Sequence, residues 1–184
     1  MNNDVKQGME WQSAYYDDFA RILRANAHNL LTIRQGTPDE DMRRATDFVI
    51  ELGGGGRVAA RVRRDGKFYG DITLRSYSRG YKTELEKLRE GGEEIAKYYL
   101  YCWTGATKKI ENWLMWDIDK MRAAGLLHRE WREKPNNDGT KFIMIPIDEL
   151  RTGDCILAEN LPEPPTAIVN GQRVLLTHYP SVRY

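Results

Sequence analysis

The sequence predicts an α+β domain in which a mixed central sheet is flanked by helices. Two observations carry this prediction. Segments with apolar residues at helical spacing alternate along the chain with short segments rich in β-branched and aromatic residues. One short segment, residues 98–103, is apolar on both faces, as is typical of a central strand that helices cover. At 184 residues the chain is long enough for one domain with a proper core.

The first part of the chain predicts a helix followed by three strands. Residues 9–31 form the expected helix, because four apolar side chains recur at helical spacing: Tyr15, Phe19, Ile22 and Leu23. A threonine-proline pair at the start of residues 37–44 indicates a short helix or turn. The three strands are expected over residues 47–52, 57–64 and 68–77. Since four glycines and then Asp65-Gly66 separate them, we expect an antiparallel meander.

The rest of the chain predicts helices and strands in turn. The expected segments are a helix over residues 82–94, strands over 98–103 and 112–118, a helix closing at Gly125, a strand over 141–147 and a short helix stopped by Gly153. A proline-rich run begins at Pro162 and is typical of a linker. We therefore expect a single α/β domain over residues 1–161, and a linker with an extended arm over 162–184 that contains a hairpin around Asn170-Gly171.

Composition excludes several classes of protein. No apolar run approaches the roughly 18 residues that a membrane span needs, and the first residues do not resemble a signal peptide. A cytoplasmic protein without a membrane partner is expected. Cys102 and Cys155 form neither a zinc pattern nor a disulfide framework, and the three histidines are dispersed. A phosphate-cradling glycine loop with its lysine is also absent, which argues against a nucleotide hydrolase.

Basic residues are concentrated in one stretch, residues 57–82, although the net charge of the whole chain is +1. This stretch has eight basic residues against Asp65 and Asp71: Arg57, Arg61, Arg63, Arg64, Lys67, Arg75, Arg79 and Lys82. Strand alternation places Arg61 and Arg63 on one face and Val58, Ala60 and Val62 on the other. Two neighbouring arginines need an anionic partner or water. The partner could be a phosphate or a carboxylate such as Asp47 or Asp71.

The order helix, three strands, helix, strand resembles the core of the restriction-endonuclease-like, or PD-(D/E)xK, nuclease superfamily. In that superfamily one strand starts with an acidic residue, and the next carries an acid-x-lysine triplet. Asp47 resembles the first acidic residue, whereas Arg61-Val62-Arg63 stands where the triplet is expected. Acidic residues of the first helix often assist, and the candidates are Glu10, Asp17 and Asp18. The resemblance implies a nuclease-like domain, a Mg²⁺ cofactor and a nucleic-acid substrate, with DNA favoured over RNA.

The chain is also similar to uncharacterised bacteriophage proteins over residues 40–155. The shared features are an Arg-x-Arg-Arg strand, an Asp-Ile-Thr-Leu-Arg-Ser segment, a Lys-Thr-Glu-Leu-x-Lys helix start and a Tyr-Tyr-Leu-Tyr-x-Trp strand. This similarity implies a phage origin, and hence the host cell cytoplasm, without an established function.

A divergent catalytic site is one hypothesis for the basic stretch. Phosphodiester cleavage with a metal needs carboxylates beside the phosphate and a cation for the developing charge. The carboxylates available are Asp47, Glu51, Asp71 and Glu84. In this hypothesis Asp47 and Asp71 hold the metal, Glu84 assists, and Arg63 or Lys82 replaces the lysine. The alternative hypothesis pairs Asp47 and Asp71 with Arg61 and Arg63 as cross-strand ion pairs on a solvated sheet face.

Binding without catalysis is also compatible with the sequence. Nucleic-acid contacts are predicted for Arg57, Arg61, Arg63, Arg64, Arg75, Arg79 and Lys82. The helix start at residues 81–84 fits either an anion site or a cap formed by Thr83. The alternative function is a protein-binding or inhibitor module whose arginines meet an acidic surface of a host or phage protein. That surface could be the acidic stretch 148–163 of a second copy in a homodimer.

Overall fold

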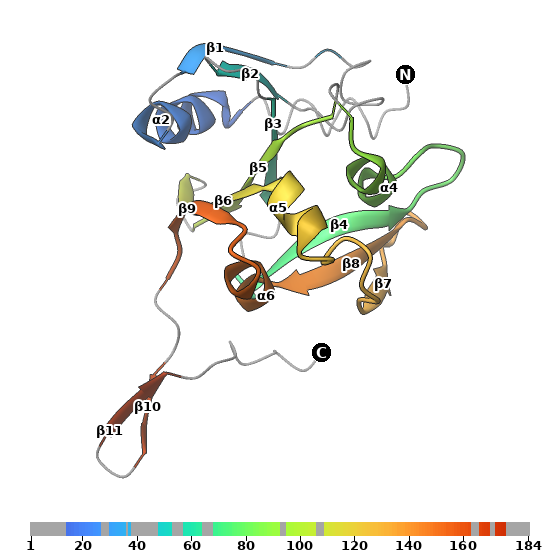
Figure 1. Ribbon diagram of the computed structural model, residues 1–184. Coiled ribbons are helices and arrows are strands. Elements are labelled where there is room, and N and C mark those ends of the chain that lie inside the picture. The colour runs from blue at the N-terminus through green and yellow to red at the C-terminus, as the bar shows by residue number, and fades with distance from the viewer. Residues whose placement is uncertain are drawn as a thin grey trace.

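A mixed four-stranded sheet forms the centre of the fold in the computed structural model, which describes residues 14–26, 30–35, 37, 48–52, 57–63, 68–92, 95–105, 109–162, 166–169 and 172–175 (Figure 1). Its strands, in spatial order, are β3 (Val58–Arg63), β5 (Tyr98–Thr104), β6 (Ile110–Asp117) and β9 (Ile156–Asn160). Strands β3 and β5 are parallel, whereas β6 is antiparallel to both β5 and β9. The predicted α+β class with a mixed sheet and helices is confirmed.

One face of the central sheet packs against helix α2 (Tyr16–Asn26) and a two-stranded sheet of β1 (Leu30–Gln35) and β2 (Phe48–Leu52). Apolar residues at helical spacing give α2 one buried face, while Asp17 and the half-buried Asp18 lie in its first turn, where the helix dipole favours negative charge. The core on this side includes Phe19, Ile22, Leu23, Ile50, Val58, Ala60, Val62, Leu100 and Cys102.

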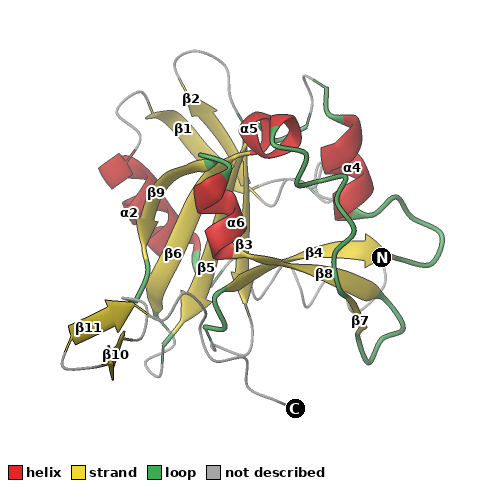
Figure 2. Cartoon of the chain, turned by 60° about the horizontal axis from the view of Figure 1, so that its bottom comes forward, coloured by secondary structure: helices red, strands yellow, loops and turns green. Residues whose placement is uncertain are grey.

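The opposite face of the central sheet packs against a second, three-stranded sheet (Figure 2). This sheet has the order β4 (Asp71–Tyr77), β8 (Lys141–Pro146) and β7 (Glu133–Pro135), and its strands cross those of the central sheet. The helices on this side are α4 (Glu84–Glu90), α5 (Ile118–Ala123) and α6 (Ile147–Thr152). Large aromatic side chains fill the layer: Tyr99 stacks on Trp116 with ring centroids 4.6 Å apart.

The predicted antiparallel meander is wrong in its pairing. The three strands exist, but β2 pairs with β1, β3 pairs in parallel with β5, and β4 pairs with β8. The predicted first helix is also too long, since α2 ends at Asn26 and β1 begins at Leu30. A turn signal reverses the chain without specifying the sheet that the next strand joins, and burial against distant segments decides that choice.

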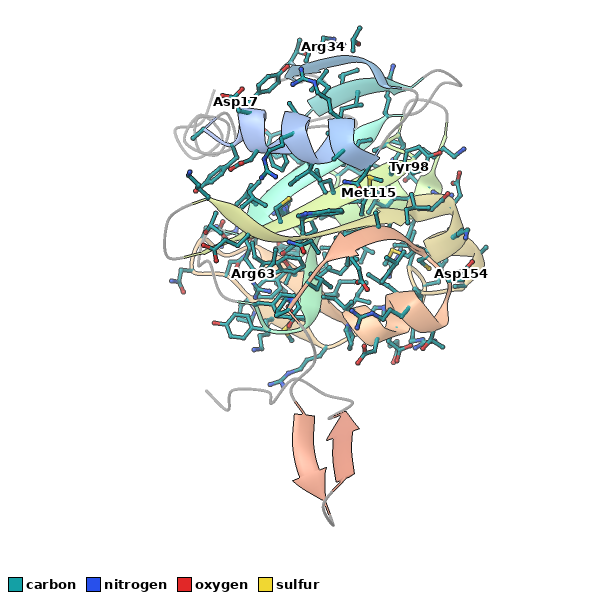
Figure 3. All side chains as sticks on the ribbon, turned by 90° about the vertical axis from the view of Figure 1, so that its left-hand side faces the viewer. Asp17, Arg34, Arg63, Tyr98, Met115 and Asp154 are labelled. Carbon is teal, nitrogen blue, oxygen red and sulfur yellow. The ribbon has the colours of Figure 1, made fainter. Side chains whose placement is uncertain are left out.

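The last described strands, β10 (Thr166–Val169) and β11 (Gln172–Leu175), form an antiparallel hairpin of their own. The hairpin predicted around Asn170-Gly171 is therefore confirmed. It projects away from the layered part of the structure (Figures 1 and 3). No helix in the described part of the chain combines the length and apolar character that a membrane span requires.

Candidate nucleic-acid interface

The structure separates the predicted basic residues into an inner and an outer group. Arg61 and Arg63 lie between the two sheets, with side chains 26% and 16% exposed. The outer group, Arg75, Arg79 and Lys82, is exposed at the end of β4 and in the loop that leads to α4. Arg57 is half-buried just before β3. Asp47 and Arg64 lie outside the described residues, as do Glu10, Asp65 and Lys67.

Arg61 and Glu84 together complete the free edge of strand β4. Arg61 Nη1 donates to the carbonyl oxygen of Thr73 at 3.1 Å and lies 3.0 Å from Glu84 Oε2. The same carboxylate oxygen accepts the backbone N–H of Arg75 at 3.0 Å. Alternate residues of a strand direct their backbone groups to the same side, so the pair supplies the donor and acceptor that a neighbouring strand would offer.

Tyrosine hydroxyls extend this network into the core. Tyr99 donates to the other carboxylate oxygen of Glu84. The Tyr101 hydroxyl lies 2.7 Å from Thr73 Oγ1, and burial raises the pKa of Tyr101, so it stays protonated. The polar groups of this network thus have hydrogen-bond partners, which is the condition for burial without a large penalty, whereas the buried indole nitrogens of Trp103 and Trp116 in the same core have none among the described residues.

Arg63 and Asp71 form the second ion pair between the sheets, with Arg63 Nη1 2.6 Å from Asp71 Oδ1. The Arg63 guanidinium also lies 4.8 Å from the centroid of the Tyr69 ring, a cation–π contact. The ion-pair hypothesis is confirmed for Asp71, and among the described residues Arg61 pairs with Glu84. Both pairs are half-buried and do not lie on a solvated sheet face. The reason is that β4 pairs with β8 in the second sheet, so that the unpaired edge of β4 faces the two arginines.

The predicted catalytic set is only partly assembled. Asp71, Glu84 and Arg63 come from neighbouring elements, and each of the two carboxylates faces an arginine. Lys82 lies apart from them, in an exposed ion pair with Glu90. Within the described ranges no three His, Cys, Asp or Glu side chains are grouped to hold a metal ion. Because Asp47 lies outside those ranges, the magnesium site stays a prediction.

The outer group lies among exposed aromatic side chains. Tyr77 is 46% exposed and Tyr81 is 73% exposed. The register of β4 against β8 shifts between Arg75 and Tyr77, an irregularity of the bulge type that re-aims side chains at the end of a strand. Gly80 then adopts a φ of +80°, which a glycine accepts without strain. The chain from 75 to 82 therefore presents cationic and aromatic groups in turn.

The second sheet places further cations and rings beside this segment, on both of its faces. Phe142 is half-buried and lies opposite Arg75 on β4 and opposite Lys134 on β7. Directly opposite residues of antiparallel strands share a face, so a cation stands on each side of the ring. Lys141 Nζ lies 5.7 Å from the centroid of the Tyr77 ring. We give the name basic–aromatic surface to the exposed cations and rings of the segment from 75 to 82: Arg75, Tyr77, Arg79, Tyr81 and Lys82.

Two guanidinium groups of the basic–aromatic surface are available to a ligand. In the part of the chain that the structure describes, neither Arg75 nor Arg79 forms an ion pair. The Arg79 guanidinium lies against Gly139 in the turn between β7 and β8. Arg75 contributes to the lowered pKa of Asp138, which results first from the hydrogen bonds of Thr140. These arginines differ in this respect from Arg61 and Arg63.

Sequence reasoning missed the aromatic half of this surface. Tyr77 and Tyr81 are exposed, whereas Tyr99 and Tyr101 are buried in the core. The local signal was the alternation Arg-Ser-Tyr-Ser-Arg-Gly-Tyr-Lys, which lacks the apolar period of a buried strand. Comparisons with protein-family models, curated proteins and solved structures find no match for this chain.

Thr83 forms a capping box at the start of α4. Its hydroxyl accepts the N–H of Glu86 at 3.2 Å, and the Glu86 carboxylate accepts the N–H of Thr83 at 2.6 Å. The capping role predicted for Thr83 is therefore confirmed. These hydrogen bonds hold the pKa of Glu86 below its ordinary value.

Replacing Thr83 with alanine is expected to lower the free energy of unfolding by about 1 kcal/mol at neutral pH. Because the pKa of Glu86 is lowered on folding, its contribution is present above the ordinary glutamate pKa and is lost as the pH falls through the lowered value. Urea titrations at about pH 7 and about pH 3 should therefore show that the variant and the unaltered protein differ less in their free energy of unfolding at the acidic pH. Thr83→Ser keeps the hydroxyl and is the control; an equal loss in this variant would contradict the capping role.

Proposed function

We propose that the protein binds nucleic acid through the basic–aromatic surface. The observation that carries the proposal is the pair of exposed guanidinium groups, Arg75 and Arg79, which lack an ion pair among the described residues and alternate along the chain with the exposed rings of Tyr77 and Tyr81. Cations attract the phosphates of a nucleic acid and exposed rings offer it flat apolar area. The resemblance to phage proteins supports a phage or host nucleic acid as ligand, with DNA favoured over RNA.

The inner arginines have a different role in this proposal. Arg61 and Arg63 already neutralise Glu84 and Asp71, and a phosphate that reached them would have to displace those carboxylates. Their ion pairs therefore support a role in holding β4 against the central sheet. Of the predicted contacts described here, Arg75, Arg79 and Lys82 are assigned to the nucleic acid.

A protein partner is the alternative, because tyrosine and arginine are also frequent at the centres of protein interfaces. The acidic stretch predicted to dock on a second copy gives it little support. Arg151 lies 2.8 Å from Asp148 and 3.1 Å from Glu159, and Arg129 lies 2.7 Å from Glu149. Each of these acids thus already has a basic partner within its own chain.

The double substitution Arg75→Gln/Arg79→Gln is expected to weaken DNA binding and to make the binding less dependent on salt. If each arginine contacts one phosphate, the slope of log K against log salt concentration falls by about 1.4–1.8. Fluorescence anisotropy of a labelled oligonucleotide over a salt series measures this slope.

The matched control removes two positive charges elsewhere. Arg24 on α2 and Lys109 beside β6 are exposed, and Arg24→Gln/Lys109→Gln changes the net charge by the same amount. An equal loss of slope in this control would show general electrostatic attraction and not a site. Unchanged binding by the Arg75/Arg79 variant would also remove the proposal.

The predicted magnesium-dependent cleavage is tested with the same oligonucleotides. Product that forms with Mg²⁺ and disappears in Asp47→Ala supports a nuclease with divergent catalytic residues. Binding without cleavage supports a non-catalytic module built on a nuclease-like element order.

A further inference from the structure

We propose that the basic–aromatic surface selects single-stranded nucleic acid, with Tyr77 and Tyr81 stacking on unpaired bases; this inference rests on the proposed function. The starting point is the exposure of the two rings. Among the described residues, the only other large apolar side chain of comparable exposure is Leu157, at 42%. Tyr81 contributes little to the packing of the fold, since 73% of it is exposed to solvent.

The two rings are close enough in the chain to engage one strand. Tyr81 follows Tyr77 by four positions, and four residues of extended chain span at most about 14 Å. Between and beside them stand Arg79 and Lys82, so each ring has a cation next to it along the chain. Backbone phosphates and bases alternate along a single strand in the same manner. The surface thus matches a single strand in charge and in apolar area.

A duplex would use this surface less well. Its bases are stacked on one another, so that aromatic rings cannot reach their faces, and only the phosphates, the sugars and the base edges in the grooves remain as contacts. Direct readout of a duplex places a helix or a two-stranded ribbon in the major groove. The helix beside this surface, α4, has 7 residues and begins with the Thr83–Glu86 capping box. Selectivity for single strands over duplexes is therefore expected to come from the two tyrosine rings, whereas the arginines should contact the phosphates of both forms.

The experiment compares a labelled thymidine oligonucleotide with a duplex of the same length, by anisotropy at one salt concentration. The unaltered protein is expected to bind the single strand more tightly. Tyr77→Ala and Tyr81→Ala should each weaken single-strand binding by about fivefold to a hundredfold, and should change duplex binding little. Tyr77→Phe and Tyr81→Phe keep the ring, and should retain single-strand affinity. Circular dichroism confirms that each variant is folded.

The outcomes separate the two proposals. Equal or tighter binding of the duplex by the unaltered protein, or full single-strand affinity in the alanine variants, overturns the inference while leaving nucleic-acid binding in place. A loss in the phenylalanine variants equal to that in the alanine variants would also overturn it, since a hydroxyl and not a ring would then make the contact. Failure of the unaltered protein to bind either form removes the proposed function, and the inference with it.

Discussion

Replacing Glu84 with alanine is expected to lower the free energy of unfolding by about 2–3 kcal/mol. The change leaves the Arg61 guanidinium, the Arg75 N–H and the Tyr99 hydroxyl without their acceptor. The Glu84 side chain is 10% exposed, so water cannot readily take its place. Urea denaturation followed by tryptophan fluorescence measures the loss.

An exposed ion pair provides the control. Glu149 pairs with Arg129, and their side chains are 36% and 48% exposed. Glu149→Ala should cost about 0.5 kcal/mol or less, because exposed pairs contribute little. A double-mutant cycle of Arg61→Ala and Glu84→Ala then isolates their coupling. If Glu84→Ala were no more destabilising than Glu149→Ala, the edge-completing role of the pair would be wrong.

Replacing Leu74 with alanine is expected to cost about 2–5 kcal/mol, the largest effect predicted for a single change here. Leu74 is 0% exposed and belongs to the core between the two sheets. The change removes buried apolar volume from the strand that leads into the 75–82 segment, and the surrounding side chains can fill the space only in part. Native domains have roughly 5–15 kcal/mol of stability, so a large share should be lost.

Leu157→Ala is the matched control for Leu74→Ala. It makes the same substitution, also in a strand, but at a side chain that is 42% exposed. Its cost should be about 0.5 kcal/mol. Both variants are compared by urea titration at the same temperature. Similar losses in the two would contradict the assignment of β4 to the core.

Local patterns in the sequence were enough to predict many of the elements. Residues 58–63 form a strand with Arg61 and Arg63 on the face opposite Val62, because the alternation of side chains is a property of the strand itself. The apolar segment 98–103 lies within the central strand β5 for a similar reason: burial on both faces requires apolar residues at every position. The cap at Thr83 likewise depends on atoms three residues apart.

The pairing of strands and the partners of the arginines could not be predicted in this way. Glu84 meets Arg61 from a helix 23 positions further along the chain, and it does so because β4 pairs with β8 and presents its free edge to β3. Whether an arginine is neutralised depends on such encounters, since an ion pair forms only at short distance and is strengthened by burial.

The same holds for the aromatic residues. Tyr101 and Tyr77 have the same side chain, yet Tyr101 lies in the central strand between two layers and Tyr77 lies at the end of β4, where it is 46% exposed. Local sequence therefore determined the elements and the concentration of charge in residues 57–82. Only the packing of distant strands decided which of those charges stabilise the fold and which face solvent, because burial depends on neighbours that the local pattern does not contain.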